Sequence, residues 1–208
     1  MDELVWNHIS ARFEDGWLIT PGRMHWDEIK PADIIRASDN VTADIIHSSV
    51  YAVRPDVKAI VHLHTKYAVA VACLKQGFEA LTQDGSFFYG KVAVHPWEGV
   101  SDDPSEGARI GANVLKVPNC NILLMPNHGF CTFASSVGEA FVQAFYFEKA
   151  CETLVLALGA AGGDRSKIGW PDAGIMKKAG GQAYSPQFAP GVCEWDAIVR
   201  MVQRKDGA

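Results

Sequence analysis

The first part of the chain alternates apolar and polar positions in a way that predicts a β-hairpin. Residues 4–12 alternate in their second half, and residues 17–20 form a second β-prone run after the turn-like Glu14-Asp15-Gly16. Pro21-Gly22 ends the second strand. Residues 27–35 predict a helical turn or two, interrupted by Pro31.

Helical spacing of apolar residues marks four further segments. Asp39-Asn40 offers N-cap chemistry to a helix that ends before Pro55, and residues 67–75 predict a buried helix closed by Gly77. Residues 104–115 begin with a proline and continue with helix formers. The longest helix is expected over residues 137–158, ended by Gly159, with four large side chains on its buried side: Phe141, Phe145, Leu154 and Leu158.

Strand-like runs lie between these helices, at residues 58–64, 91–94, 121–125 and 130–133. Strands and helices alternate without a regular βαβ rhythm, and the glycine patterns of nucleotide-binding loops are missing. Residues 160–190 are rich in Gly, Pro and Ala and predict an extended arm, followed by a short helix over residues 194–203. We expect a single domain over residues 1–208, with a core at about 4–163 and a C-terminal arm at 164–208.

Two histidines suggest a metal site. His62 and His64 lie at i and i+2 in a β-prone stretch, so their side chains point to the same face of a strand. A third imidazole from the distant Asn127-His128-Gly129 segment would complete a set of three. Three histidines are the usual donors for a catalytic zinc or related divalent ion that keeps one position open for substrate.

The composition of the chain excludes some classes of binding partner. The chain has 208 residues, 48% of them hydrophobic and 21% charged, with a net charge of -5, so we expect a globular domain that binds neither nucleic acid nor an anionic membrane. No apolar run reaches the roughly 18 residues that span a bilayer, and the polar start is unlike a signal peptide. The 5 cysteines form no CxxC pair, which favours buried free thiols in the cytoplasm.

The motifs together resemble the class II aldolase/adducin head-domain family. The resemblance covers about residues 4–163 and rests on an ordered set: Asn7 to Arg12, Ile19-Thr20-Pro21, His47 to Tyr51, Arg54 to Val57, Val61 to Thr65, Asn127-His128-Gly129, and Gly138 to Phe141 leading into Glu148. It implies a three-layer α/β/α fold around a mainly antiparallel sheet. It also implies a cyclic homotetramer with a divalent metal, usually zinc but with Mn or Fe as alternatives, in a cleft between subunits. Known family activities include sugar-phosphate aldolases, an epimerase, a dehydratase and decarboxylases.

The resemblance assigns roles to individual residues. His62, His64 and His128 match the metal ligands of the family; the alternative is that each is a hydrogen-bonded core histidine. Asn7, Thr20 and Gly22 fall where aldolases contact a substrate phosphate. For Asn7 and Gly22 the alternatives are a cap of the hairpin and a simple turn.

The chain departs from the aldolases at one position. Their general base is a Glu shortly before the position of His47, where this chain has Val41-Thr42-Ala43. Loss of a base costs a factor of about 10²–10⁴ in rate. The adducin-like branch also lacks this Glu. Gln83 and Asp84 lie about twenty residues after His64, where the aldolases place a substrate-facing residue. The resemblance therefore makes Asp84 the candidate for the replacement acid or base; the alternative is that Asp84-Gly85 only forms a turn.

These observations predict a metal-dependent carbon–carbon lyase that acts on a small hydroxy or keto acid through a metal-stabilised enolate. Without the Glu, decarboxylation is favoured over aldol cleavage, because loss of carbon dioxide needs no base at carbon. One alternative is an adducin-like oligomerisation or binding module without catalysis. Another is a non-haem iron oxygenase, because three histidines can hold Fe(II).

Overall fold

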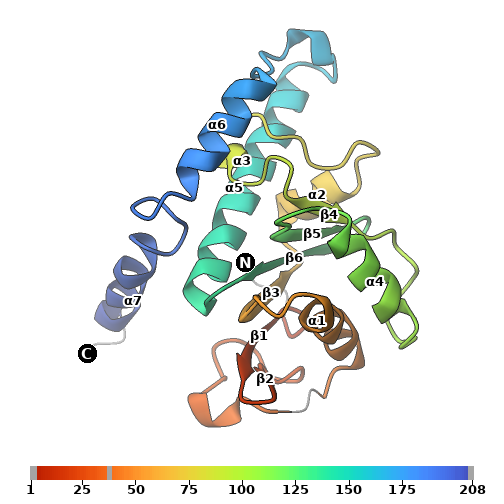
Figure 1. Cartoon of the computed structure of the whole chain (residues 1–208), viewed down its shortest axis with the longest axis vertical. Helices are drawn as coiled ribbons and strands as arrows, with labels where there is room; N and C mark the ends of the chain where they lie inside the picture. Colours follow the sequence, from red (N-terminus) through yellow and green to blue (C-terminus); the bar gives the residue numbers. More distant parts are fainter. Residues whose placement is uncertain (1–3, 37–38, 206–208) are drawn as a thin grey trace.

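The computed structural model describes residues 4–36 and 39–205, which form a six-stranded sheet between two layers of helices (Figure 1). The strand order is β2-β1-β3-β6-β5-β4. Every pair is antiparallel except β4 with β5. The strands are β1 (His8–Phe13), β2 (Gly16–Ile19), β3 (Ala59–Leu63), β4 (Val92–Val94), β5 (Ile122–Met125) and β6 (Gly129–Ala134).

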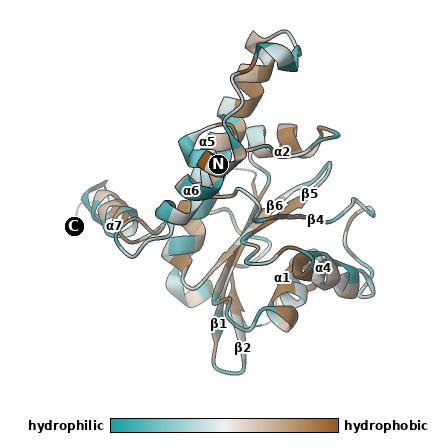
Figure 2. Ribbon diagram, turned by 45° about the horizontal axis from the view of Figure 1, so that its top comes forward, coloured by the Kyte–Doolittle hydropathy of each residue, from teal (hydrophilic) through white to brown (hydrophobic). Residues whose placement is uncertain are grey.

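Helices cover both faces of this sheet, with α1 and α4 on one side and α2 and α5 on the other (Figures 1 and 2). Their bounds are α1 (Val41–Val53), α2 (Lys66–Ala72), α3 (Gln83–Ser86), α4 (Glu106–Leu115), α5 (Val137–Ala160), α6 (Ala173–Ala183) and α7 (Glu194–Lys205), with short 3-10 turns at Pro31–Asp33 and Arg165–Lys167. The predicted three-layer α/β/α fold with a mainly antiparallel sheet is confirmed.

Strand β3 shows why two cores form. Val61 and Leu63 belong to the core under α2 and α5, whereas Ile60 belongs to the core under α1 and α4. Side chains of a strand alternate between faces, and all five residues of β3 are buried because both faces are covered. His62 therefore lies on the same face as Ile60, towards α1.

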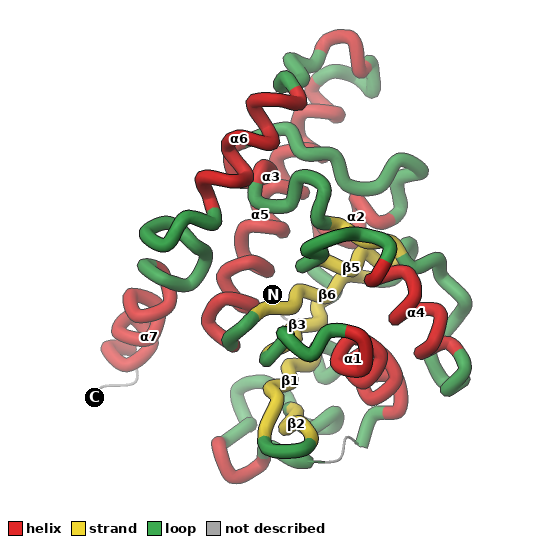
Figure 3. The backbone as a smooth tube through the Cα atoms, viewed as in Figure 1, coloured by secondary structure: helices red, strands yellow, loops and turns green. Residues whose placement is uncertain are grey.

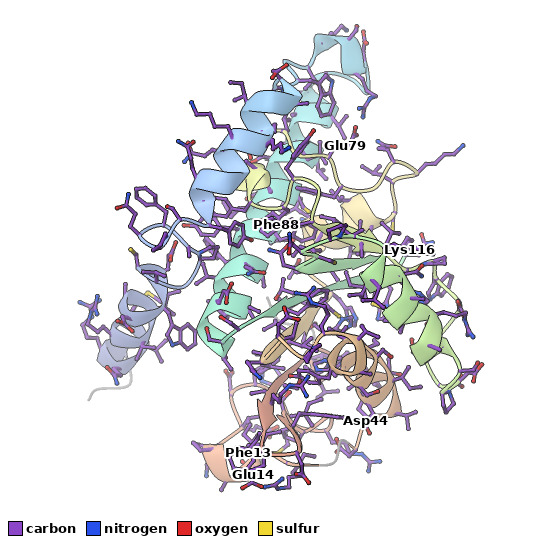
Figure 4. All side chains as sticks on the ribbon, viewed as in Figure 1. Phe13, Glu14, Asp44, Glu79, Phe88 and Lys116 are labelled. Carbon is purple, nitrogen blue, oxygen red and sulfur yellow. The ribbon has the colours of Figure 1, made fainter. Side chains whose placement is uncertain are left out.

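The α2 and α5 side of the sheet is filled largely by aromatic rings. Phe88, labelled in Figure 4, is fully buried; its ring centroid lies 5.2 Å from that of Phe147 and 6.2 Å from that of Phe78. Phe130 of β6 lies 4.9 Å from Phe147. These edge-on and tilted contacts fix α5 against the strands that carry the candidate site.

Helix α5 ends later than expected. The predicted stop at Gly159 is wrong, because Gly159 is helical and the chain reverses at Gly162 and Gly163, whose φ angles are 63° and 78°. The Gly163 amide donates to Leu158 and the Gly162 amide to Gly159, both at 2.9 Å. This is the Schellman motif, in which glycine is favoured because it adopts a positive φ without a steric cost.

The buried face of α5 also differs from the prediction. Phe145 was expected to be buried but is 48% exposed, because Ala140, Ala144, Phe147, Cys151 and Leu154 are the α5 residues that face the sheet. Apolar residues surround most of this helix, so helical spacing alone does not select one face. Similarly, Cys73 and Cys193 are exposed, whereas the other three cysteines are buried; all are free.

The arm after residue 160 is more regular than predicted. It contains helix α6, capped by Asp172 side-chain hydrogen bonds to the Gly174 and Ile175 amides, and then the expected helix α7 (Figure 3). Helix α6 packs on α3 through Gly180, where a Cβ atom would meet the Ser86 carbonyl oxygen at 2.6 Å. A helix that packs through glycine has little apolar periodicity, so its sequence resembles a loop. No helix in the described residues is both long and apolar enough to cross a membrane.

Candidate metal centre

Three imidazoles converge at one end of the sheet. His62 is the last but one residue of β3 and His64 directly follows the strand, and their Nε2 atoms lie 2.8 Å apart. His128 comes from the turn between β5 and β6, and its ring centroid lies 4.9 Å from His62 and 4.8 Å from His64. One ligand nitrogen from each ring lies within 4.8 Å of the others. The antiparallel pairing of β3 with β6 is what brings the distant turn to the histidine pair.

The environment keeps the rings of His62 and His128 uncharged. His62 is fully buried, and burial first, then the neighbouring imidazoles, lower its pKa well below the usual value. Burial and the nearby His64 lower the pKa of His128 to about 4. A neutral imidazole keeps a nitrogen lone pair, which is the form that binds a metal.

Neighbouring groups hold two of the rings in place. His62 Nδ1 lies 3.2 Å from Cys131 Sγ, and the His64 backbone amide donates to Asn7 Oδ1 at 3.0 Å. Burial raises the pKa of the Cys131 thiol, so its sulfur remains protonated and is not an anionic ligand. When Nδ1 of His62 donates to Sγ, its Nε2 lone pair is directed at His64. Such outer contacts fix the orientation of ligating histidines.

The three residues fit a divalent ion of the zinc type. Tetrahedral Zn–N bonds of about 2.0–2.1 Å separate neighbouring nitrogens by about 3.3 Å, close to the 2.8 Å between the His62 and His64 Nε2 atoms. Two neutral imidazoles that face each other through Nε2 either share a proton or donate to a common cation. The rings border a cavity of about 250 Å³, which leaves space for a further ligand.

A second histidine network, which sequence reasoning missed, also borders this cavity. His8 lines it and stacks on His62 with ring centroids 4.5 Å apart. Its Nδ1 lies 2.7 Å from His47 Nε2, and His47 Nδ1 lies 2.5 Å from Ser10 Oγ. The signal for this network is the i, i+2 spacing of His8 and Ser10, which places both on the face of β1 that α1 covers.

The remaining predicted residues are outside the cavity wall of this chain. The Thr20 hydroxyl accepts from the Ile9 amide at 3.0 Å, and the Gly22 amide donates to Asp39 at 2.7 Å, so both serve the hairpin and its following loop. Gln83 and Asp84 form the first turn of α3. Helix α3 packs against α5, and Asp84 is one of the groups that raise the pKa of Tyr146 on α5, after burial and the Glu194 carboxylate.

Apolar and neutral polar side chains complete the cavity wall. Trp6 and Val100 are exposed apolar residues that border it, and Asn40 and Thr42 at the start of α1 supply its polar part. Ala43 is buried in the first turn of the same helix. Within the described ranges, the residues that line this cavity include no aspartate or glutamate.

A sheet between two helical layers, with three histidines converging at one end, defines an α/β protein with a candidate metal centre. The chain belongs to the Class II Aldolase and Adducin N-terminal domain family, which it matches over residues 1–155.

Relatives and solved structures agree with this assignment. A Pseudomonas aeruginosa protein named as a class 2 aldolase is 30% identical over 220 residues, covering 99% of this chain and 83% of that one. Alpha-adducin of Rattus norvegicus is 30% identical over 228 residues, covering 96% of this chain; the chain spans 30% of that relative's length. The crystal structure of an aldolase II superfamily protein from Pseudomonas syringae has a TM-score of 0.86 and 28% identity, covering 98% of this chain and 86% of that one.

Proposed function

We propose that the protein is a metal-dependent carbon–carbon lyase acting on a small hydroxy or keto acid. The observation that carries this proposal is the convergence of His62, His64 and His128 on one cavity. A divalent ion bound there, zinc with manganese or iron as alternatives, would act as a Lewis acid for negative charge that develops beside a carbonyl group.

The residues of the cavity then bind and orient the substrate. The apolar side chains of Trp6 and Val100 exclude water from the reacting carbon, and Asn40 and Thr42 offer hydrogen bonds to hydroxyl or carboxylate oxygens. Among the described residues no carboxylate lines the wall, so a reaction that begins with removal of a proton from carbon lacks the carboxylate base of the aldolases. Decarboxylation avoids this step, since the departing carbon dioxide leaves its electron pair on the neighbouring carbon, and the electron pair then needs only a proton donor.

We propose Asp84 as that donor, acting with Gln83 in the cavity of a neighbouring subunit. Within one chain Asp84 faces α5, so the role requires a homo-oligomer, for which the family resemblance favours a tetramer. Trp6 and Val100 are 58% and 77% exposed beside the cavity, which supports a site covered by a second subunit. The free cysteines support a reducing compartment such as the cytoplasm.

The proposal is tested by metal analysis and turnover together. Protein loaded with zinc, manganese or iron is assayed with hydroxy acids, keto acids, aromatic carboxylates and sugar phosphates, and carbon dioxide release is measured. We expect one bound metal per chain and turnover that His128→Ala abolishes. Stoichiometric metal without turnover on any substrate would rule out the lyase.

Subunit mixing tests the role of Asp84. Asp84→Asn and His128→Ala are each expected to be inactive alone. Mixed oligomers unfolded and refolded together would regain part of the activity, because some cavities then combine intact histidines with an intact Asp84 from the neighbour. Full activity of Asp84→Asn alone would remove Asp84 from the mechanism and leave the metal centre unaffected.

A second candidate function is an adducin-like scaffold without catalysis. The 30% identity to alpha-adducin over 96% of this chain favours it. A scaffold has no requirement for stoichiometric metal, so protein that is purified without metal and is unchanged in thermal stability on metal addition would support this function. Oxygen consumption by iron-loaded protein would instead indicate an oxygenase.

A further inference from the structure

A second cavity lies at the opposite end of the sheet from the histidines. Strand β6 begins beside His128 and ends at Ala134, and the cavity opens where β6 passes into α5 (Figure 1). Six strand residues separate the two ends by roughly 20 Å. The cavity measures about 280 Å³, at the lower end of the range of small-molecule sites, about 300–1,000 Å³.

The wall of this second cavity includes a buried acceptor without a partner. Gln143 of α5 is 1% exposed, and its Nε2 donates to Glu139 Oε1 at 3.2 Å. Because a carboxylate only accepts hydrogen bonds, this contact fixes the amide orientation and leaves Oε1 as the unpaired atom. An unpaired buried acceptor costs about 1–3 kcal/mol, so a hydrogen-bond donor at this position would stabilise the site.

A second buried side-chain amide also has a paired nitrogen and an unpaired oxygen. Asn121 is 7% exposed, donates through Nδ2 to the Tyr184 hydroxyl, and leaves Oδ1 unpaired. Asn121 precedes β5 and Gln143 lies on α5, so two elements that line one cavity each carry an unpaired, buried amide oxygen. A ligand with more than one N–H or O–H donor would give both amide oxygens a partner.

Lys91 also lines this cavity and provides a hydrogen-bond donor with a positive charge. Lys91 Nζ lies 3.3 Å from the centre of the Tyr184 ring. Among the described residues the nearby carboxylate that acts on it is Glu139, which forms no ion pair with it. Burial lowers the pKa of Lys91 to about 8, although Glu139 opposes the shift. The other cation of the wall, Arg54, is already bonded to both oxygens of Asp56. Lys91 is thus the group that would bind an acceptor or anion.

We propose that this cavity binds an α-amino acid, with its ammonium group on the amide oxygens of Gln143 and Asn121 and its carboxylate on Lys91. A simple anion would leave both amide oxygens unpaired, and a simple amine would leave Lys91 without a partner. The site is independent of the lyase reaction, because its residues lie at the other end of β6 from the histidines.

Calorimetric titration of the protein with each of the common L-amino acids tests the proposal. We expect saturable binding of at least one of them with one site per chain. Propionate and ethylamine, which carry only the carboxylate or only the amine of alanine, are expected to bind more weakly than alanine. Equal binding of either one would contradict the two-ended site.

Variants then locate the binding. Gln143→Leu removes the amide oxygen and Lys91→Met removes the cation; each is expected to weaken binding by about 10–100-fold, the cost of a lost charged hydrogen bond. Lys116→Met is the matched control, because Lys116 lies at the exposed end of α4 (Figure 4) and is expected to leave affinity unchanged. His128→Ala is also expected to bind the amino acid normally, which separates this site from the metal centre.

Three results would overturn the proposal. The first is the absence of binding for every amino acid. The second is binding that Gln143→Leu and Lys91→Met leave unchanged while circular dichroism shows both variants folded. The third is a crystal structure grown with the amino acid in which only water occupies the cavity.

Discussion

His8 Nδ1 and His47 Nε2 lie 2.7 Å apart inside the protein, and His47 Nδ1 lies 2.5 Å from Ser10 Oγ. The pair joins β1 to α1 beneath the candidate metal centre. Each ring uses the other as a hydrogen-bond partner, so the β1 strand and the helix that covers it are held together by polar contacts within an otherwise apolar layer.

His47 makes the protein sensitive to acid. Burial lowers the pKa of His47 to about 3, from 6.5 in the unfolded chain. The unfolded state therefore takes up a proton that the folded state does not, and the free energy of unfolding falls as the pH decreases from 6.5 towards 3. The slope for one proton is about 1.4 kcal/mol per pH unit.

The variant His47→Gln should reduce this slope by one proton. The free energy of unfolding should also fall by about 1–3 kcal/mol at pH 8, because Ser10 and His8 each lose a hydrogen-bond partner. Urea unfolding from pH 4 to pH 8 in the presence of EDTA measures both effects. Identical slopes for the variant and the parent protein would show that His47 does not titrate on unfolding.

Gly129 allows the close approach of His64. A Cβ atom at this position would lie 2.6 Å from His64 Cδ2 and 2.6 Å from the Leu63 carbonyl oxygen. Gly129→Ala should displace the His64 ring, destabilise the fold by about 1–3 kcal/mol and weaken metal binding. Gly16→Ala, whose Cβ would meet nothing within 4 Å, is the control for thermal unfolding and metal titration. An alanine at residue 129 that binds metal as well as the control does would contradict the steric argument.

Cys131 orients a metal ligand. Its sulfur lies 3.2 Å from His62 Nδ1, so Cys131→Val should leave that nitrogen unpaired and lower zinc affinity by about 10–100-fold. Cys131→Ser keeps a hydrogen-bonding atom and should retain most of the affinity. Competition with a chelating dye measures the two values, and the idea fails if valine and serine give the same affinity.

Glu148 of α5 caps the start of α2. Its carboxylate accepts from the amides of Tyr67 and Ala68 at 3.1 and 2.9 Å and from the Thr65 hydroxyl. Glu148→Ala should cost about 1–3 kcal/mol in chemical unfolding, and Glu148→Gln less, because one oxygen remains. Glu152→Gln, which loses only the surface pair with Lys149, should change stability by less than about 1 kcal/mol. Equal effects at the two glutamates would argue against the cap.

Zinc should stabilise the folded protein through the three histidines. A ligand at about 100 times its dissociation constant adds about 2.7 kcal/mol to the free energy of unfolding, which EDTA should remove. His64→Ala should abolish this increase in thermal denaturation, whereas His25→Gln, remote from the cavity, should preserve it. Persistence of the zinc effect in His64→Ala would exclude His64 as a ligand.

Sequence patterns predict the spacing of residues along a helix or strand better than they predict which face of that element is buried. The i, i+2 pair of His62 and His64 was predicted from strand geometry, and pairing of β3 with β6 brings His128 to it. Phe145 was misplaced because α5 is apolar on most sides. Helix α6 was missed because Gly180 packs through the absence of a side chain. Such features depend on the surface opposite, which local patterns do not encode.

The candidate site shows the same limit. His8 was not assigned to the cavity, although its register partner in β3 is His62 itself. Asp84 was selected by its distance along the chain from His64, but that distance does not specify where α3 packs. Its position follows from the packing of α3 against α5, a tertiary contact. Its role now depends on a neighbouring subunit.

The position of β3 in the sheet sets an order of events during synthesis. Its hydrogen-bonding neighbours are β1, which precedes it, and β6, whose last residue is Ala134. At about 5–20 residues per second, a ribosome exposes the histidine pair several seconds before the strand that completes its pairing. Such non-local strand pairing is typical of domains that fold in milliseconds to seconds. Until β6 is synthesised, the nascent chain therefore presents His62 and His64 on a strand with one unpaired edge. A chaperone would protect the chain best during this interval.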